Sequence, residues 1–251
     1  MRGGIKVKFV IQTINNKIRG IEEYILVNLI DNSPRYLDMS YILSERADID
    51  DFTDYTPVGS IEFVGQHLKE YYGIEYQNPI EIPKEMRNKH YVGRFYSILP
   101  IDKLPNRGFS FIKDVSRLKS YVGLMAITEE NKKYLTGEIY QISEYTPFMS
   151  EYRVFVLKGN IQAIQHYKED VTIFPNVEVI KEIIRDYENT NNASSAYTVD
   201  IGITEDNRTL LIEIHTFASC GTYGFYGSSL FDMYKNGYEY LIKNNKKIDI
   251  D

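Results

Sequence analysis

The sequence lacks the residues and segments on which several classes of protein depend. Its one cysteine, Cys220, cannot form an intrachain disulfide, which indicates a reducing compartment. No apolar run reaches the roughly 20 residues that a membrane-spanning helix needs. The opening residues, MRGGIKVKFVIQ, have neither the apolar core nor the cleavage site of a secretion signal. We therefore expect a cytoplasmic protein with no membrane partner.

Several catalytic signatures are also missing. The four histidines and the cysteine show no zinc-type spacing, and neither a Ser-His-Asp signature nor a Gly-x-x-x-x-Gly-Lys-Ser/Thr phosphate loop occurs. The net charge of −6 and the pI near 5.4 argue against a general nucleic-acid binder. A local basic groove around a phosphate group stays compatible with that charge. Tryptophan is absent while tyrosine is abundant, which is typical of an AT-rich bacterial or phage genome.

What remains is the composition of an ordinary globular protein. With 251 residues, 43% of them hydrophobic and 25% charged, the chain can form one large core or two smaller lobes. Two prolines between 78 and 83 suggest a connector, so we place a lobe boundary near residue 100. Strands are expected at 7–12, 24–30, 108–113, 137–144, 152–158, 161–167, 197–203 and 210–215, the fourth to sixth as a meander. Helices are expected from Ser60, from Ser116 to Gly123, from Asn176 and from about Ser229.

Residues 197–215 read as a β-hairpin with one acidic face. If Asp200 lies opposite Glu213, Thr198 and His215 share their face, because side chains alternate along a strand. The opposite face would pair Val199 with Ile214, Ile201 with Ile212, and Ile203 with Leu210. Two facing carboxylates repel each other unless a positive charge lies between them, and a divalent metal with oxygen ligands is the simplest candidate. The alternative is a half-exposed hairpin whose polar face has no function.

Three basic residues are candidates for binding phosphate. Lys113, Lys119 and Arg153 could each be a solvated surface charge, which is the usual case. Arg153 differs because it interrupts an aromatic and aliphatic strand, Glu151-Tyr152-Arg153-Val154-Phe155-Val156, where a guanidinium needs a partner or a ligand. The glycine-rich stretch Ala218 to Gly227, which follows the acidic strand directly, is expected to border a substrate pocket through Gly221 and Tyr223.

Taken in order, these motifs resemble the ATP-grasp superfamily, in the clade that binds nucleotide phosphates with one arginine and two lysines. The matching segments are Phe111-Ile112-Lys113, Leu118-Lys119-Ser120, Ser143-Glu144-Tyr145, Tyr152-Arg153-Val154, Asp200-Ile201-Gly202 and Ile212-Glu213-Ile214-His215. The resemblance implies an α+β fold in which two α+β subdomains clasp ATP, preceded by a smaller α/β lobe. The expected domains are therefore residues 1–100 and 101–251.

The resemblance also implies a function and a set of site residues. ATP would lie against the strand that carries Gln141, Ile142, Ser143 and Glu144, with its phosphates near Lys113, Lys119 and Arg153 and with Mg²⁺ at Asp200 and Glu213. The implied reaction activates a carboxylate as an acyl-phosphate, joins it to an amine, and releases ADP and phosphate. The partners would be a small-molecule or peptide carboxylate and an amine. The oligomeric state stays open.

One position departs from the family pattern. His215 stands where the family usually has an asparagine metal ligand, and imidazole suits softer ions better than it suits Mg²⁺. His215 could therefore bind the metal or support the residues that do. Two alternatives stay open for this reason: a non-catalytic nucleotide-binding module, and an ATP-grasp enzyme that modifies or repairs nucleic acid, which the acidic net charge disfavours.

Overall fold

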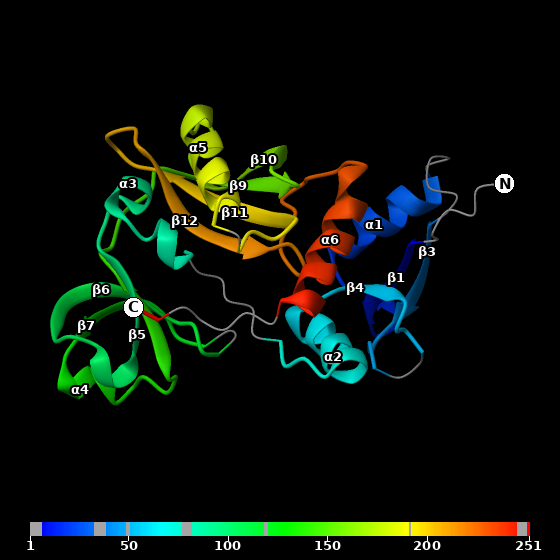
Figure 1. The fold of residues 1–251 in the computed structure, drawn as a ribbon, viewed down its shortest axis with the longest axis horizontal. Coiled ribbons are helices and arrows are strands. Elements are labelled where there is room, and N and C mark those ends of the chain that lie inside the picture. Colours follow the sequence, from blue (N-terminus) through cyan, green and yellow to red (C-terminus); the bar gives the residue numbers. More distant parts are fainter. Residues whose placement is uncertain are drawn as a thin grey trace.

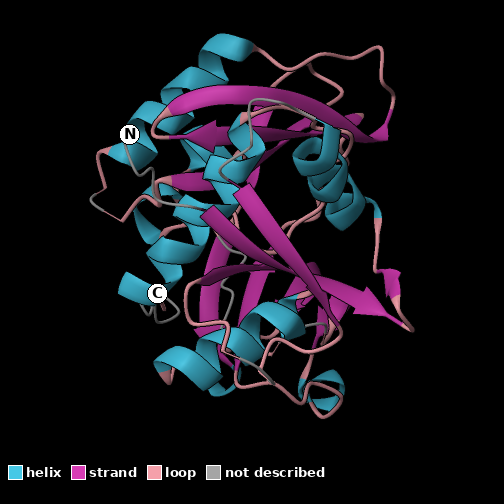
Figure 2. Cartoon of the chain, turned by 90° about the vertical axis from the view of Figure 1, so that its right-hand side faces the viewer, coloured by secondary structure: helices cyan, strands magenta, loops and turns pink. Residues whose placement is uncertain are grey.

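The computed structural model describes residues 7–32, 39–48, 51–76, 82–117, 120–190, 192–244 and 250–251. This part of the chain contains three sheets of four strands each and six α-helices (Figure 1). Figure 2 shows the same chain from the side, with the helices packed around the sheets. The protein is therefore mixed α+β, as the sequence predicts.

The first sheet is built around strand β1 (Val7–Ile14). Strands β3 (Met39–Ser44) and β4 (Tyr55–Val58) both pair with it in parallel, and the short β2 (Lys17–Ile18) pairs antiparallel with its end. The expected strand at 7–12 is confirmed. Helices α1 (Ile21–Asn32) and α2 (Ile61–Tyr72) belong to the same lobe.

The expected strand at 24–30 is wrong, because these residues form most of helix α1. A short aliphatic run fits a buried strand and a buried helix equally well, so its composition could not decide between them. The helix buries Ile25, Leu26 and Leu29 and leaves Tyr24 exposed. Its first turn carries two glutamates, which favour a helix N-terminus.

Helix α2 begins and ends where the sequence predicts. The Ser60 hydroxyl accepts a hydrogen bond from the backbone amide of Phe63, which caps the N-terminus. Gly73 closes the other end with φ of 66°, a left-handed conformation that costs glycine little. Residues 77–81, within the expected connector, lie outside the described residues.

The second sheet has the strand order β5-β8-β6-β7 and is antiparallel. Its strands are β5 (Tyr96–Pro100), β6 (Arg107–Asp114), β7 (Val122–Ile127) and β8 (Ile139–Ser143), with short helices α3 (Lys89–Val92) and α4 (Glu129–Lys132) nearby. Strand β5 ends at residue 100 and pairs with β8, so it belongs to the second sheet. The lobe boundary near residue 100 stays a prediction. A helix from Ser116 to Gly123 is wrong, since Gly123 lies within β7.

The third sheet has the order β10-β9-β11-β12 and holds most of the acidic and basic candidates. Its strands are β9 (Ser150–Leu157), β10 (Asn160–Glu169), β11 (Ala196–Ile203) and β12 (Thr209–Thr216). The expected meander is wrong, because β8 belongs to the second sheet and only β9 and β10 pair as neighbours. Helix α5 (Val177–Glu188), capped by Asn176 as predicted, packs its apolar side on the face of Val154 and Val199.

Helix α6 (Ser229–Lys243) lies between the first and third sheets (Figure 1). Phe231 and Met233 share one core with Phe9 of β1 and Phe155 of β9, so these two sheets are joined by buried apolar contact. Gly237 is required for this arrangement, because a Cβ there would fall 1.7 Å from the carbonyl oxygen of Phe217. The second sheet has its own core around Ile112, Tyr140 and Ile142.

A buried histidine also ties α2 to α6. The Nε2 of His67 lies 2.8 Å from the carbonyl oxygen of Phe52, and its Nδ1 lies 2.6 Å from the hydroxyl of Tyr238. A carbonyl oxygen can only accept, so Nε2 carries the proton and Nδ1 accepts from Tyr238. Burial lowers the pKa of His67 to about 4, and the neutral form is the one that fits.

This pKa predicts a loss of stability in acid. The unfolded histidine binds a proton below its ordinary pKa of about 6.5, whereas the folded one does so only near 4. The contribution of His67 is therefore complete above the unfolded pKa and declines as the pH falls through the window between the two values. Urea unfolding of the wild type and of His67→Gln at about pH 7 and about pH 5 measures it. His67→Gln should lose less stability on acidification, whereas the exposed control His90→Gln should behave as wild type. Equal acid sensitivity of all three proteins would contradict this role.

Candidate active site

Strand register places three charged side chains in a row across the third sheet. Arg153 of β9 lies directly opposite Asp200 of β11, and Asp200 lies opposite Glu213 of β12. The predicted pairing of Asp200 with Glu213 is thus confirmed. Arg153 donates from both Nε and Nη2 to the two oxygens of Asp200, each at 2.7 Å. This two-point ion pair is buried, with Arg153 7% and Asp200 2% exposed.

A lysine from the second sheet completes the row. Lys113, near the end of β6, places its Nζ 3.0 Å from Oε2 of Glu213. The Nη2 of Arg153 lies 4.0 Å from the other oxygen of Glu213. The positive charges beside Asp200 and Glu213 in this structure are therefore the side chains of Arg153 and Lys113. The other predicted lysine, Lys119, lies outside the described residues.

The surrounding charges fix the protonation of these groups. Burial by itself raises the pKa of Glu213, but the charge and hydrogen bond of Lys113, together with the charge of Arg153, outweigh it and lower the pKa. Burial also raises the pKa of Asp200, against the effect of Arg153. Because both oxygens of Asp200 accept from the guanidinium, this carboxylate is ionised here.

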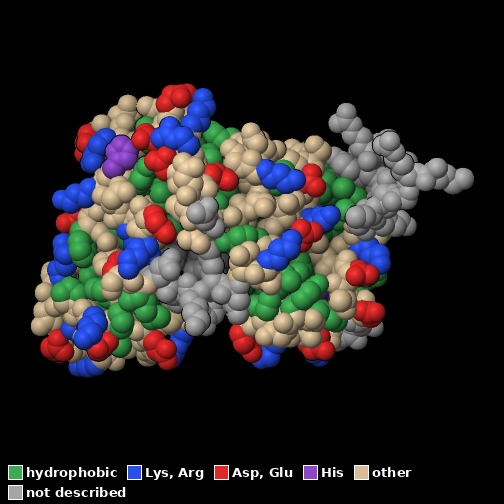
Figure 3. Space-filling model, in the orientation of Figure 1, with side chains coloured by type: hydrophobic (Ala, Val, Ile, Leu, Met, Phe, Trp, Pro, Cys, Tyr) green, Lys and Arg blue, Asp and Glu red, His purple; other side chains and the backbone are tan. Residues whose placement is uncertain are grey.

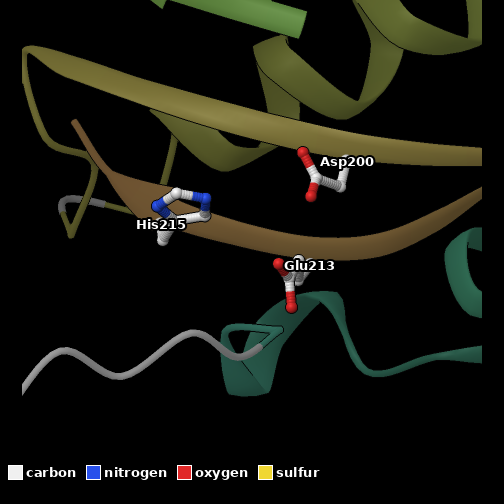
Figure 4. Close-up of side chains that lie close together, drawn as sticks. All are labelled: Asp200, Glu213 and His215. Carbon is white, nitrogen blue, oxygen red and sulfur yellow. The ribbon is translucent and has the colours of Figure 1, made fainter. Parts of the chain in front are cut away.

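His215 stands beside the acidic pair, as predicted (Figure 4). Its Nε2 lies 2.8 Å from the hydroxyl of Thr198, the residue opposite it on β11. Its Nδ1 is buried and has no hydrogen-bond partner among the described residues. Burial lowers the pKa of His215 to about 3, so the ring is neutral. Potential ligand atoms of Asp200, Glu213 and His215 all lie within 4.8 Å of one another.

A cavity of about 290 Å³ opens between the second and third sheets beside this row. Among the predicted nucleotide-binding residues, Gln141, Ser143 and Glu144 line it, whereas Ile142 is fully buried in the core on the other face of β8. Because β8 is paired on both edges, with β5 and β6, most of its backbone amide and carbonyl groups form hydrogen bonds within the sheet. The segment 145–148, which belongs to no strand, lines the same cavity.

A β-bulge in β12 changes the predicted hairpin face. The register shifts after Asp200, so that Ile201 pairs with Leu211 and Ile203 with Thr209. The expected pairs Ile201 with Ile212 and Ile203 with Leu210 are therefore wrong. An alternating pattern cannot reveal one extra residue in a strand. The bulge buries Leu211 in the core and leaves Ile212 in the cavity wall, where it adds apolar surface.

The glycine-rich loop contacts the arginine. The carbonyl oxygen of Gly221 accepts a hydrogen bond from Nη1 of Arg153 at 3.2 Å. The Arg153 guanidinium lies 5.0 Å from the ring centre of Tyr223, which stacks on Tyr167 at 4.9 Å between ring centres. Tyr223 is 43% exposed and has φ of 47°, a backbone conformation that side-chain-bearing residues seldom adopt. Both predicted loop residues thus lie at Arg153.

Sequence reasoning did not identify three further residues of this site. Lys168 and Arg94 line the cavity, and Tyr167 covers Arg153 from β10. Lys168 donates to Oε1 of Glu151 at 2.6 Å, and the Tyr167 hydroxyl donates to Oε2 of the same carboxylate at 2.8 Å. A bulge between His166 and Lys168 interrupts the alternation of side chains along β10. The alternating pattern that could have placed Tyr167 and Lys168 on one face is therefore missing.

A family model described as "ATP-grasp domain, R2K clade family 2" matches residues 91–233, more than half of the chain. The protein belongs to this ATP-grasp family. The matched span contains Lys113, Arg153 and the acidic row. No curated protein matches the sequence.

Solved structures share the ATP-grasp fold at low sequence identity. D-alanine–D-alanine ligase from Bacillus anthracis, complexed with ATP, has a TM-score of 0.57 at 13% identity, covering 96% of this chain and 99% of that one. N5-carboxyaminoimidazole synthetase from Staphylococcus aureus has a TM-score of 0.52 at 15% identity, covering 93% and 78%. At such identities the likeness concerns the fold alone. In the described part of this ATP-grasp protein, no helix has the length and apolarity to cross a membrane.

The buried ion pair predicts a large effect on stability. Asp200→Asn removes the charge that Arg153 faces and should lower the free energy of unfolding by on the order of 3 kcal/mol, because the buried guanidinium loses its two-point partner. Urea unfolding measures the change. The matched control is Asp206→Asn in the turn of the same hairpin, where the pair with Arg208 is exposed, and it should have little effect. Equal effects of the two substitutions would show that the Arg153–Asp200 pair does not support the fold.

Proposed function

We propose that the protein is an ATP-dependent ligase that joins a carboxylate to an amine. The observation that carries the proposal is the meeting of Arg153 and Lys113 with Asp200 and Glu213 at the edge of the cavity between two sheets. Two cations facing two carboxylates can be redistributed when a polyphosphate and a divalent ion enter together. The family membership and the ligase names of the structural neighbours agree with this reading.

The site residues fit a magnesium nucleotide. Asp200 and Glu213 offer carboxylate oxygens, which Mg²⁺ prefers. The buried Nδ1 of His215, which has no hydrogen-bond partner within the described part of the chain, offers a further ligand or a hydrogen-bond acceptor. Magnesium bound there would neutralise phosphate charge. Lys113 and Arg153 would then turn from the carboxylates toward the phosphates, and Phe111 and Ile212 would give the base an apolar wall.

In the proposed reaction, an oxygen of the substrate carboxylate attacks the γ-phosphorus of ATP. The bond between that phosphorus and the β–γ bridging oxygen breaks, and ADP leaves with the electron pair. An amine then attacks the acyl carbon, loses a proton, and displaces phosphate to leave an amide. Charge neutralisation and in-line positioning are the contributions that such a transfer requires, and the proposed site would supply both without a covalent nucleophile.

The nucleotide product tests this function against its alternatives. The purified protein is incubated with ATP, Mg²⁺ and pools of amino acids, peptides or nucleic acids. ADP together with a new amide supports the ligase, AMP supports an enzyme acting on nucleic acid, and binding without a product supports a nucleotide-binding module. Lys, Arg, Asp and Glu side chains are interspersed over the face that Figure 3 shows, which does not favour a nucleic-acid surface there.

Two basic residues should affect different steps. Arg153→Lys keeps a charge but loses the planar fork, so ADP release should slow about 100-fold with little change in nucleotide affinity. Lys113→Ala should weaken nucleotide affinity about tenfold. Calorimetry and steady-state kinetics separate the two effects, and the exposed Lys133→Ala, remote from the cavity, is the control. Wild-type affinity in Lys113→Ala would assign that lysine to the fold alone.

The glycine-rich loop is proposed to shape the site of the second substrate. Tyr223→Ala removes the ring beside Arg153 and should raise the KM for that substrate or lower kcat, while nucleotide affinity stays near wild type. Tyr226→Ala, in the same loop but 58% exposed, is the matched control. Parallel loss of ATP and acceptor binding in Tyr223→Ala would mean that the loop is scaffold.

A further inference from the structure

His215 carries a buried ring nitrogen that needs a partner. The residue is 4% exposed, and its Nδ1 has no hydrogen-bond partner among the described residues. A buried polar atom without a partner costs free energy. A ligand that engages this nitrogen is therefore favoured.

The other ring nitrogen is held in place. Nε2 lies 2.8 Å from the hydroxyl oxygen of Thr198, which is opposite His215 on β11 and fully buried. A histidine that binds a metal donates its second ring N–H to a fixed acceptor of this kind, which orients the ring. With the proton on Nε2, the ring donates to Thr198, and Nδ1 presents a free electron pair.

The ring lies on the same side of the sheet as the two carboxylates (Figure 4), because residues two apart in a strand share a face. One potential ligand atom from each of Asp200, Glu213 and His215 lies within 4.8 Å of the others. Ligands on opposite sides of one ion, each about 2.1 Å from it, are separated by about 4.2 Å. The span of the three groups is therefore close to that of one shared ion, and a water between the nitrogen and the ion would need a wider set.

This set of donor atoms suits a transition ion better than it suits Mg²⁺. Mg²⁺ takes oxygen ligands and gives up its waters reluctantly, whereas imidazole nitrogen is a ligand of transition ions. Zn²⁺ favours four ligands that are mostly nitrogen and sulfur. Mn²⁺ accepts carboxylate oxygens as Mg²⁺ does, and it also accepts a nitrogen. Two carboxylates with one imidazole therefore favour Mn²⁺.

We propose that His215 is a direct metal ligand through Nδ1 and that it makes this site selective for Mn²⁺ over Mg²⁺. The proposal rests on the proposed function, because the phosphates of the nucleotide would supply further oxygen ligands. Asp200 and Glu213 accept either ion. The preference therefore comes from the histidine.

Electron spin echo envelope modulation tests the nitrogen ligand directly. The full chain is loaded with Mn²⁺, with and without the non-hydrolysable β,γ-methylene analogue of ATP, and modulation from nitrogen bound to Mn²⁺ is recorded. The wild type with the analogue should show this modulation. His215→Asn, which offers an amide oxygen in place of the ring nitrogen, should lose it. Loss in the variant assigns the signal to the histidine, because the adenine nitrogens are present in both samples.

Calorimetric titration with each ion in the presence of the analogue measures the selectivity. His215→Asn should weaken Mn²⁺ binding by at least about tenfold, since even the outer partners of a metal ligand contribute this much, while Mg²⁺ affinity should change far less. The matched control is His166→Asn, the same substitution on β10. The ring of His166 contacts Tyr152, which points to the face of the sheet away from Arg153. This control should keep wild-type affinity for both ions.

Three results would overturn the proposal. They are the absence of nitrogen modulation in the wild type, equal weakening of Mn²⁺ and Mg²⁺ in His215→Asn, and wild-type Mn²⁺ affinity in that variant. The wild-type spectrum decides the matter even where the variant fails to fold. Failure of the analogue to bind would instead refute the proposed function, and the nucleotide-free Mn²⁺ sample would then decide the metal ligand.

Discussion

The site depends on the register of β9, β11 and β12, which puts Arg153, Asp200 and Glu213 side by side on one face of a sheet. Each charge is costly to bury alone, and each has a partner of opposite sign, Arg153 for Asp200 and Lys113 for Glu213. The other face of the same strands is apolar and packs against α5. A shift of one residue in any of these strands would exchange the two faces, so core packing and site geometry are fixed by the same pairing.

The row is also the place where separate parts of the chain meet. Lys113 arrives from the second sheet, Gly221 and Tyr223 from the loop after β12, and Tyr167 from β10. Arg153 donates a hydrogen bond to the carbonyl oxygen of Gly221 in the loop and lies near one carboxylate oxygen of Glu213. Lys113 contacts the other carboxylate oxygen of Glu213. A change of charge at the row would therefore act on the second sheet and on the loop together.

Two cavities lie near the row, and each offers charged groups of both signs. The cavity between the sheets has two lysines, one arginine and four glutamates beside its apolar residues. The cavity between α1, the start of α2 and the glycine-rich loop has two glutamates and one arginine among its described lining residues. Gly221 and Arg153 separate them. A two-substrate reaction needs such a division, because the reacting groups must meet while their remaining parts are recognised apart.

The sequence by itself determined the elements whose signals are local. Ser60 and Gly73 bound a helix through their own backbone chemistry, and alternation in β11 and β12 put Asp200 opposite Glu213. Ordered motifs were enough to indicate the ATP-grasp family.

The tertiary structure decided what depends on distant partners. The run at 24–30 is a helix, because a short aliphatic run leaves the choice between helix and strand open. Ile212 lies in the cavity because a bulge shifts β12, and Glu22 of α1 reaches the loop after β12 because α6 joins the first and third sheets. Residues far apart in sequence leave no local pattern, so the direct contacts of Arg153 with Asp200 and of Lys113 with Glu213 could not be predicted from it.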